Sequence, residues 1–175
     1  MCAILQGMTL LGNALRGLVA AAVGTLAMDL VLYRRARRSG TTQPFGSWEF
    51  SEGLNRWEDA PAPAHVGKRA FEALSGRPLP PTKARLTNNV MHWFYGIQWG
   101  GGYGLLAGLS SRSGPLWGLP FGTAVWASGY VVLPLMGLYK PMWKYPLPVL
   151  LRDWSAHAAY GLTTASAFQV LTRDR

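Results

Sequence analysis

Long apolar segments alternate with polar ones along this chain, and four of them have the length of a membrane-spanning helix. Leu86–Ser111, Pro115–Tyr139 and Trp154–Thr172 contain no Asp, Glu, Lys or Arg, whereas the first segment contains Arg16 and Asp29. About 20 mainly apolar residues cross the hydrocarbon core of a bilayer. The pattern predicts an all-α, polytopic membrane protein in one membrane domain, residues 1–175, with four transmembrane helices near residues 9–33, 87–110, 115–138 and 150–172.

The polar loop at residues 34–86 is predicted to contain short amphipathic helices. Pro63 and Gly76 bracket one of them, because proline favours the first turn of a helix and glycine the position after its end. One face of this helix would carry Val66, Ala70, Phe71 and Leu74. Such a helix could lie on the membrane surface or cap the bundle. Residues 139–149 are rich in proline and aromatic side chains and are predicted to run along the membrane interface.

The basic residues predict the orientation in the membrane. Ten Lys and Arg residues lie between the first two predicted spans and three between the last two, and the remaining four lie on the opposite side. Short cytoplasmic loops carry an excess of Lys and Arg. Both larger loops are therefore predicted to be cytoplasmic, and both termini to face outward.

Composition supports a membrane protein and argues against a nucleic-acid binder. Only 14% of the residues are charged, and the chain contains 8 Trp and 21 Gly. Gly, and Trp at the interfaces, are enriched in membrane helices. The net charge of +9 is confined to the gaps between apolar segments, so it does not predict a basic nucleic-acid interface. The predicted partners are the lipid bilayer and either a second copy of the chain or another membrane protein.

Small and polar residues repeat every four positions in the second predicted span. Starting from Asn88, the positions are His92, Gly96, Gly100, Gly104 and Gly108. Residues four apart share a helix face, and successive small residues let a neighbouring backbone approach closely. The stripe therefore predicts a helix-packing groove with Asn88 and His92 at its cytoplasmic end.

The last predicted span repeats this pattern. His92-x-x-Tyr95-Gly96 matches His157-x-x-Tyr160-Gly161, and Asn88 and Asp153 stand four residues before the two histidines. The preceding spans also resemble each other weakly, with Gly17 aligned to Gly118. We interpret this as a tandem duplication of a two-helix hairpin, which is a known arrangement in transporters. The second and fourth spans would then pack stripe to stripe or around a shared centre, with His92 close to His157.

The two histidines have three interpretations that the sequence leaves open. They could hydrogen-bond between helices as packing residues. They could bind a proton or a substrate inside the bundle, with Asp153 favouring the protonated form of His157. His92, His157 and Asp153 could also bind a metal or haem, although no spacing selects one. No cofactor is therefore predicted. Tyr95, Tyr160 and Asn88 complete the candidate polar site.

Two stretches resemble a known family. They are NNVMHWFYGIQWGGGYG, which begins at Asn88, and LPLMGLYKPMWKYPLPVLLRDWSAHAAYG, which ends at Gly161. Together they resemble the YagU-like family of small bacterial inner-membrane proteins over residues 88–161. The resemblance implies location in the bacterial inner membrane and a link to acid tolerance. It implies no catalytic residues.

No sequence motif predicts an enzyme. Gly100-Gly101-Gly102-Tyr103-Gly104 lies inside an apolar segment rather than after a strand, so it is not a nucleotide-binding loop. Two classes of function remain open. One is a proton-linked or acid-stress membrane protein with polar stripes inside its helical bundle. The other is a non-catalytic assembly subunit whose glycine grooves pack helices.

Overall fold

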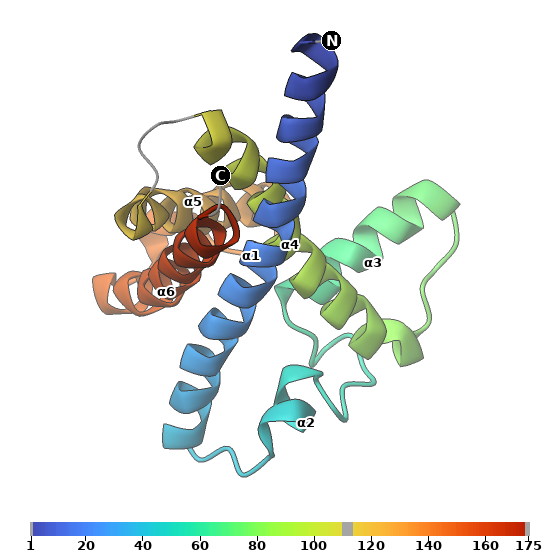
Figure 1. The fold of residues 1–175 in the computed structure, drawn as a ribbon. Helices are drawn as coiled ribbons and strands as arrows, with labels where there is room; N and C mark the ends of the chain where they lie inside the picture. The colour runs from blue at the N-terminus through green and yellow to red at the C-terminus, as the bar shows by residue number, and fades with distance from the viewer. Residues whose placement is uncertain (1, 110–113, 174–175) are drawn as a thin grey trace.

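The computed structural model describes residues 2–109 and 114–173, and this part of the chain is helical without strands. Figure 1 shows the arrangement of the elements. In chain order they are α1 (Cys2–Arg38), α2 (Phe45–Glu49), α3 (Ala62–Ser75), η1 (Pro81–Lys83), α4 (Ala84–Leu109), η2 (Pro115–Trp117), α5 (Gly118–Leu135), η3 (Met142–Lys144) and α6 (Leu147–Leu171). The all-α prediction is confirmed, and the four long helices lie where the four spans were predicted.

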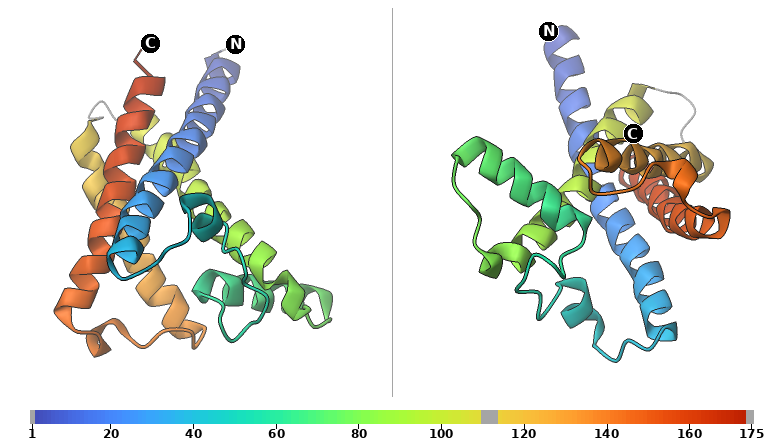
Figure 2. Two further views of the ribbon diagram at one scale, coloured as in Figure 1. Left: turned by 90° about the horizontal axis from the view of Figure 1, so that it is seen from below. Right: turned by 180° about the vertical axis from the view of Figure 1, so that it is seen from behind.

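The long helices form two antiparallel hairpins, α1 with α4 and α5 with α6, and α1 also packs along α6. Two hydrogen bonds tie α1 to α6 at opposite ends. The Arg16 Nε donates to the Leu171 carbonyl (3.1 Å), and the Arg35 guanidinium donates to the Arg152 carbonyl (2.6 Å). The start of α1 and the end of α6 therefore lie at one end of the bundle, as Figure 2 shows.

Two helices have the length and composition of a membrane span. They cover Leu10–Arg38, which contains an 18-residue stretch with a mean hydropathy of 1.7, and Pro115–Leu135, which contains one with a mean hydropathy of 1.3. Helices α4 and α6 have 26 and 25 residues and so are long enough, but neither contains an 18-residue stretch that reaches the hydropathy of a membrane span. By this measure two of the four predicted spans are candidate membrane spans, and four spans are not shown.

The predicted glycine stripe of α4 forms a close contact, and its partner is α1. A Cβ atom added at Gly100 would overlap the Gly17 carbonyl and the Ala21 Cβ. One added at Gly104 would overlap the Asn13 carbonyl, and one at Gly96 the Thr25 hydroxyl. Because the contacts of Gly100 and Gly104 involve the backbone of α1, these two positions require glycine. At the end of the stripe, Gly108 faces the side chain of Asn13.

A second glycine contact joins α5 to α6. A Cβ at Gly161 would overlap the Gly118 carbonyl, and one at Gly122 would overlap the His157 carbonyl. Each stripe thus packs against the preceding helix of its own hairpin. The expectation that α4 and α6 pack stripe to stripe is wrong, because α1 packs against both of them.

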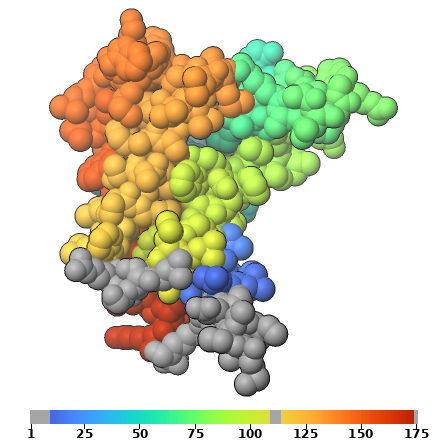
Figure 3. Space-filling model, turned by 90° about the horizontal axis from the view of Figure 1, so that it is seen from above, coloured from blue at the N-terminus to red at the C-terminus, as the bar shows by residue number. Residues whose placement is uncertain are grey.

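The loop after α1 packs along one side of α4. Helix α3 begins at Ala62 and ends at Ser75, and Gly76 follows with a left-handed φ of 66°, which glycine adopts without strain. Gly67 faces Met91 of α4, while Leu74 is 90% exposed. The predicted face around Leu74 is therefore not the one that caps the bundle. Figure 3 shows the α3 segment beside the chain that follows α5, where Arg69 donates to the Met136 carbonyl.

Candidate functional site

The most buried charged residue of the described chain is Asp29 of α1, which contacts His92 of α4. Asp29 is only 2% exposed. The His92 Nε2 lies 3.0 and 3.1 Å from the two carboxylate oxygens of Asp29. One N–H thus faces both oxygens, and this geometry suits a donor imidazole and an ionised carboxylate. Burying a lone carboxylate is costly, so the His92 contact stabilises Asp29 in its site.

Helix α2 adds a second carboxylate, Glu49, to this pair. Tyr33 at the end of α1 stacks against Phe45 and Trp48 with ring centroids 5.3 and 5.4 Å apart, and these contacts hold α2 against α1. Glu49 is 8% exposed, and its Oε1 has no hydrogen-bond partner among the described residues. One ligand atom from each of Asp29, Glu49 and His92 lies within 4.8 Å of the others. We name these three residues the acid cluster.

The chain that follows α2 is fastened to the start of α4. The Asn88 Nδ2 donates to the Ser51 Oγ (2.9 Å), and the Phe50 carbonyl accepts from Arg85 and Asn89 (2.9 Å each). Asn88 therefore faces this loop and not the neighbouring long helix. Its role is to position the segment that carries Glu49.

The acid cluster favours a proton on Glu49. Burial, followed by the negative charge of Asp29, raises the pKa of Glu49 from its usual 4.5 to about 7. The positive charge of His92 acts in the opposite direction and is the smaller effect. Two carboxylates and one imidazole at this distance could also bind a divalent cation, because they supply three N and O ligands. The proton and the cation would compete for the same lone pairs.

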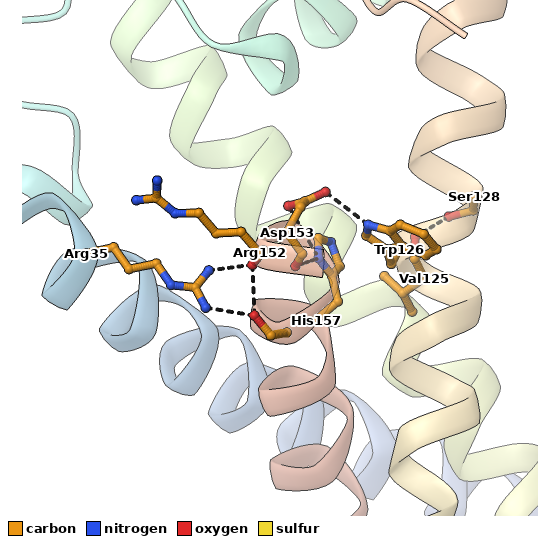
Figure 4. A network of polar contacts seen from close by, with 8 residues as sticks. Arg35, Val125, Trp126, Ser128, Arg152, Asp153 and His157 are labelled. Carbon is orange, nitrogen blue, oxygen red and sulfur yellow. Dashed lines mark hydrogen bonds and ion pairs between the residues drawn. The ribbon is translucent and has the colours of Figure 1, made fainter. Parts of the chain in front are cut away.

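The second histidine of the sequence pattern belongs to a different pair. The His157 Nδ1 lies 3.1 Å from the carbonyl and 3.7 Å from the Oδ1 of Asp153. The Trp126 Nε1 donates to the Asp153 Oδ2 (3.1 Å). Figure 4 shows this group together with Arg35 of α1, and the Arg152 side chain extends away from Asp153. The metal set predicted from His92, His157 and Asp153 is not assembled, because His92 is in the acid cluster.

His92 and His157 nevertheless line one cavity. It has a volume of about 260 Å³ and lies between the two hairpins, with α3 along its side. Tyr95 and Asp153 also line it. Four residues of the predicted polar site, His92, Tyr95, Asp153 and His157, therefore face one space between the hairpins.

The two tyrosines of the repeated motif have different partners. The Tyr160 hydroxyl donates to the Gly96 carbonyl (2.6 Å) and is 1% exposed, so it joins α6 to α4. The Tyr95 hydroxyl lies 2.5 Å from the Ser128 Oγ of α5. Each motif tyrosine thus connects its hairpin to the other one.

Asp29 and Glu49 are site residues that the sequence pattern did not predict. Counting by four from Asn13 gives Gly17, Ala21, Thr25 and Asp29, and these are the residues that face the α4 stripe. This complementary stripe in α1 could have identified Asp29. Glu49 lies in a five-residue helix, which is too short to show a periodic pattern.

The chain was compared with protein-family models, curated proteins and solved structures, and no match was found in any of the three comparisons.

Proposed function

We propose that the chain is a small integral protein of the bacterial inner membrane that responds to acid, with Glu49 taking up a proton in the acid cluster and thereby docking α2 onto the bundle. The observation that carries this proposal is the buried, unpartnered Oε1 of Glu49 beside Asp29. Two ionised carboxylates in contact in a buried site repel each other, so a proton stabilises the docked arrangement.

Several features support membrane insertion. Two helices have span-like length and hydropathy. Large apolar side chains are exposed on the outward faces of the bundle, among them Leu11 (63%), Val19 (56%), Leu106 (73%) and Leu135 (83%). Exposed apolar surface of this kind is typical of a face that contacts lipid or another protein. Asp29 and His92 lie at the end of the bundle that carries the polar loop at residues 34–86, which contains most of the basic residues.

The response to pH follows from the groups that face Glu49. These are Asp29 from α1 and His92 from α4, and Arg85 lies nearby, bonded to the Phe50 carbonyl. When Glu49 loses its proton, its charge is repelled by Asp29 more strongly than it is attracted by His92. Helix α2 would then leave the cluster. A fall in cytoplasmic pH would dock it again, and this transition would be the acid signal.

The orientation can be tested with reporter fusions. A reporter inserted after Gly76, which is exposed at the end of α3, should be active on the cytoplasmic side. One fused after Arg175 should be active on the outer side, because the start of α1 and the end of α6 lie opposite the loop. Reporters on the same side would contradict the proposed topology.

The docking of α2 can be measured by the distance between two spin labels. One label is placed at Gly46 of α2, where a side chain has free space, and one at the exposed Val90 of α4, with Cys2 replaced by Ser. In nanodiscs with chelator, the distance distribution should be narrow at about pH 5.5 and broad at about pH 8.5. Glu49→Gln should keep it narrow at both values.

Glu52→Gln is the matched control, because Glu52 is exposed and lies three residues away. It should retain the pH response of the unmodified chain. A distribution that does not change with pH in the unmodified chain would contradict the docking proposal. If a divalent cation rather than a proton docks α2, the label-to-label distance distribution in chelator would stay broad at both pH values. It would become narrow when the cation is added.

A further inference from the structure

The cavity between the hairpins has one carboxylate on its wall that the acid cluster does not use. This carboxylate is Asp153, whose side chain is 37% exposed. Its Oδ2 accepts one hydrogen bond from Trp126. A carboxylate has about four acceptor positions, so Asp153 keeps the capacity to bind a cationic group in the cavity.

No lysine or arginine pairs with Asp153 within the described residues, and the basic side chain beside it is His157, whose Nδ1 lies 3.7 Å from the Asp153 Oδ1. None of the residues that line the cavity there is Lys or Arg. The Arg35 guanidinium of α1 donates to the Arg152 carbonyl and to the Ser155 Oγ (2.8 Å). The Arg152 side chain extends away (Figure 4). The cavity therefore has a carboxylate on its wall that no lysine or arginine compensates, and the basic groups that line the cavity are the imidazoles of His92 and His157.

Aromatic rings surround the position of this charge. The Trp126 and Tyr130 centroids are 5.3 Å apart, and those of Tyr130 and Tyr139 are 5.9 Å apart. All three residues line the cavity. Aromatic faces attract cations, and aromatic walls with a nearby carboxylate suit quaternary or protonated amines. The remaining wall is mainly apolar, with Met28, Val125 and Leu133 among its residues.

We infer that this cavity binds a small lipophilic organic cation, with Asp153 as the counter-charge and Trp126, Tyr130 and Tyr139 as the aromatic wall. A neutral apolar molecule would leave the charge of Asp153 unpaired, and an anion would be repelled by it. A metal ion would find only the Asp153–His157 pair. The volume of about 260 Å³ lies just below the usual range of roughly 300–1,000 Å³ for pockets that hold drug-sized ligands, so the ligand is smaller than these.

The inference goes beyond the proposed acid response and does not depend on it. The acid cluster contributes to the cavity wall only through His92, since neither Asp29 nor Glu49 lines it. Glu49→Gln should therefore leave binding unchanged. In the unmodified chain, cation binding without any pH response of α2 would refute the proposed function alone. A pH response without cation binding would refute this inference alone.

The test compares two ligands that differ only in charge. Benzyltrimethylammonium and its neutral carbon isostere, neopentylbenzene, are titrated into the protein in nanodiscs, with Trp fluorescence as the readout and protein-free nanodiscs as the blank. The cation should bind the unmodified chain at least about tenfold more tightly. This comparison needs no variant, so it does not depend on the folding of one.

Variants then locate the site. Asp153→Asn keeps an acceptor for Trp126 but removes the charge, and it should weaken binding of the cation about tenfold while leaving the isostere unchanged. Asp59→Asn, at an exposed acid paired with Arg56, should have no effect. Equal affinity for both ligands would show an apolar cleft that lipid chains fill and would overturn the inference. So would the absence of cation binding, or cation binding that is unaffected by Asp153→Asn.

Discussion

Replacing Gly100 by Ala should destabilise the bundle by roughly 3 kcal/mol, which is at the upper end of the cost of overpacking. The added Cβ would overlap the Gly17 carbonyl and the Ala21 Cβ. A flexible side chain could move aside, but the backbone of α1 cannot do so without separating the two helices. The contact is therefore lost along several turns of α4 and α1. Unfolding in detergent with increasing denaturant measures this loss.

The same helix supplies a matched control. Gly102 is exposed, and a Cβ added there meets no atom within 4 Å. Gly102→Ala should be neutral or should stabilise by up to about 1 kcal/mol, because alanine favours a helix more than glycine does. Gly100→Ala should thus lower the free energy of unfolding, whereas Gly102→Ala should not lower it. Equal effects would remove the glycine groove as a source of stability.

Stability should fall by up to roughly 3 kcal/mol as the pH rises from about 4.5 to about 7, because of Glu49 alone. Its pKa is about 7 in the folded chain and 4.5 as the usual value. Between these values the folded state holds a proton that the unfolded state releases. A raised folded pKa gives stability that is fully present below pH 4.5 and is lost as the pH rises through 7. Above that range Glu49 causes no further change.

The free energy of unfolding is measured across this pH range for the unmodified chain and for Glu49→Gln. The difference between the two pH profiles is the contribution of Glu49. Glu49→Gln has no carboxyl at this position, so its stability should lack this part of the pH dependence. Glu52→Gln should keep it, since Glu52 is exposed. Parallel pH profiles for the unmodified chain and Glu49→Gln would show that Glu49 titrates as an ordinary carboxyl.

The sequence predicts local features of this molecule well. The apolar segments with few or no charged residues predict the positions of the long helices. The four-residue spacing from His92 to Gly108 predicts the glycine groove. Pro63 and Gly76 give α3 to within one residue of its start. Each of these features depends on residues that are neighbours along one helix, so periodicity reveals it.

The pairing of helices could not be predicted in this way. The α4 stripe fits α1 as well as it could fit α6, and only the packed structure selects α1. The two hairpins also differ in the register in which their two helices pack, and the sequence alignment does not show this difference. Gly118 packs on Gly161, the counterpart of Gly96, whereas Gly17 packs on Gly100. The hairpins thus differ by one helical turn from the alignment of Gly17 with Gly118.

The acid cluster was missed for a related reason. In the sequence, Asp29 is only a charged residue within the first predicted span, where a charge is unfavourable. Its partner His92 lies 63 positions further along the chain, and Glu49 lies in a short helix between them. Contacts at such separations are decided by tertiary packing, which local patterns do not encode. The Asn13-to-Asp29 stripe is the one local sign that Asp29 faces another helix.

The resemblance to the YagU-like family stays a prediction, as does the link to acid tolerance. The acid cluster gives this link a physical basis that can be measured without knowledge of any partner. A carboxyl group that is protonated near neutral pH would make the chain sensitive to small changes in cytoplasmic pH.

The most direct test of this account is infrared difference spectroscopy of the protein in nanodiscs during a pH titration, in the presence of chelator. A protonated carboxyl has a carbonyl stretching band that is distinct from the bands of an ionised carboxylate. We expect such a band to be present at acid pH, to disappear with a midpoint of about 7, to be absent in Glu49→Gln and to persist in Glu52→Gln. A Glu49-dependent band with a midpoint near 4.5, or a titration that Glu49→Gln leaves unchanged, would contradict the account.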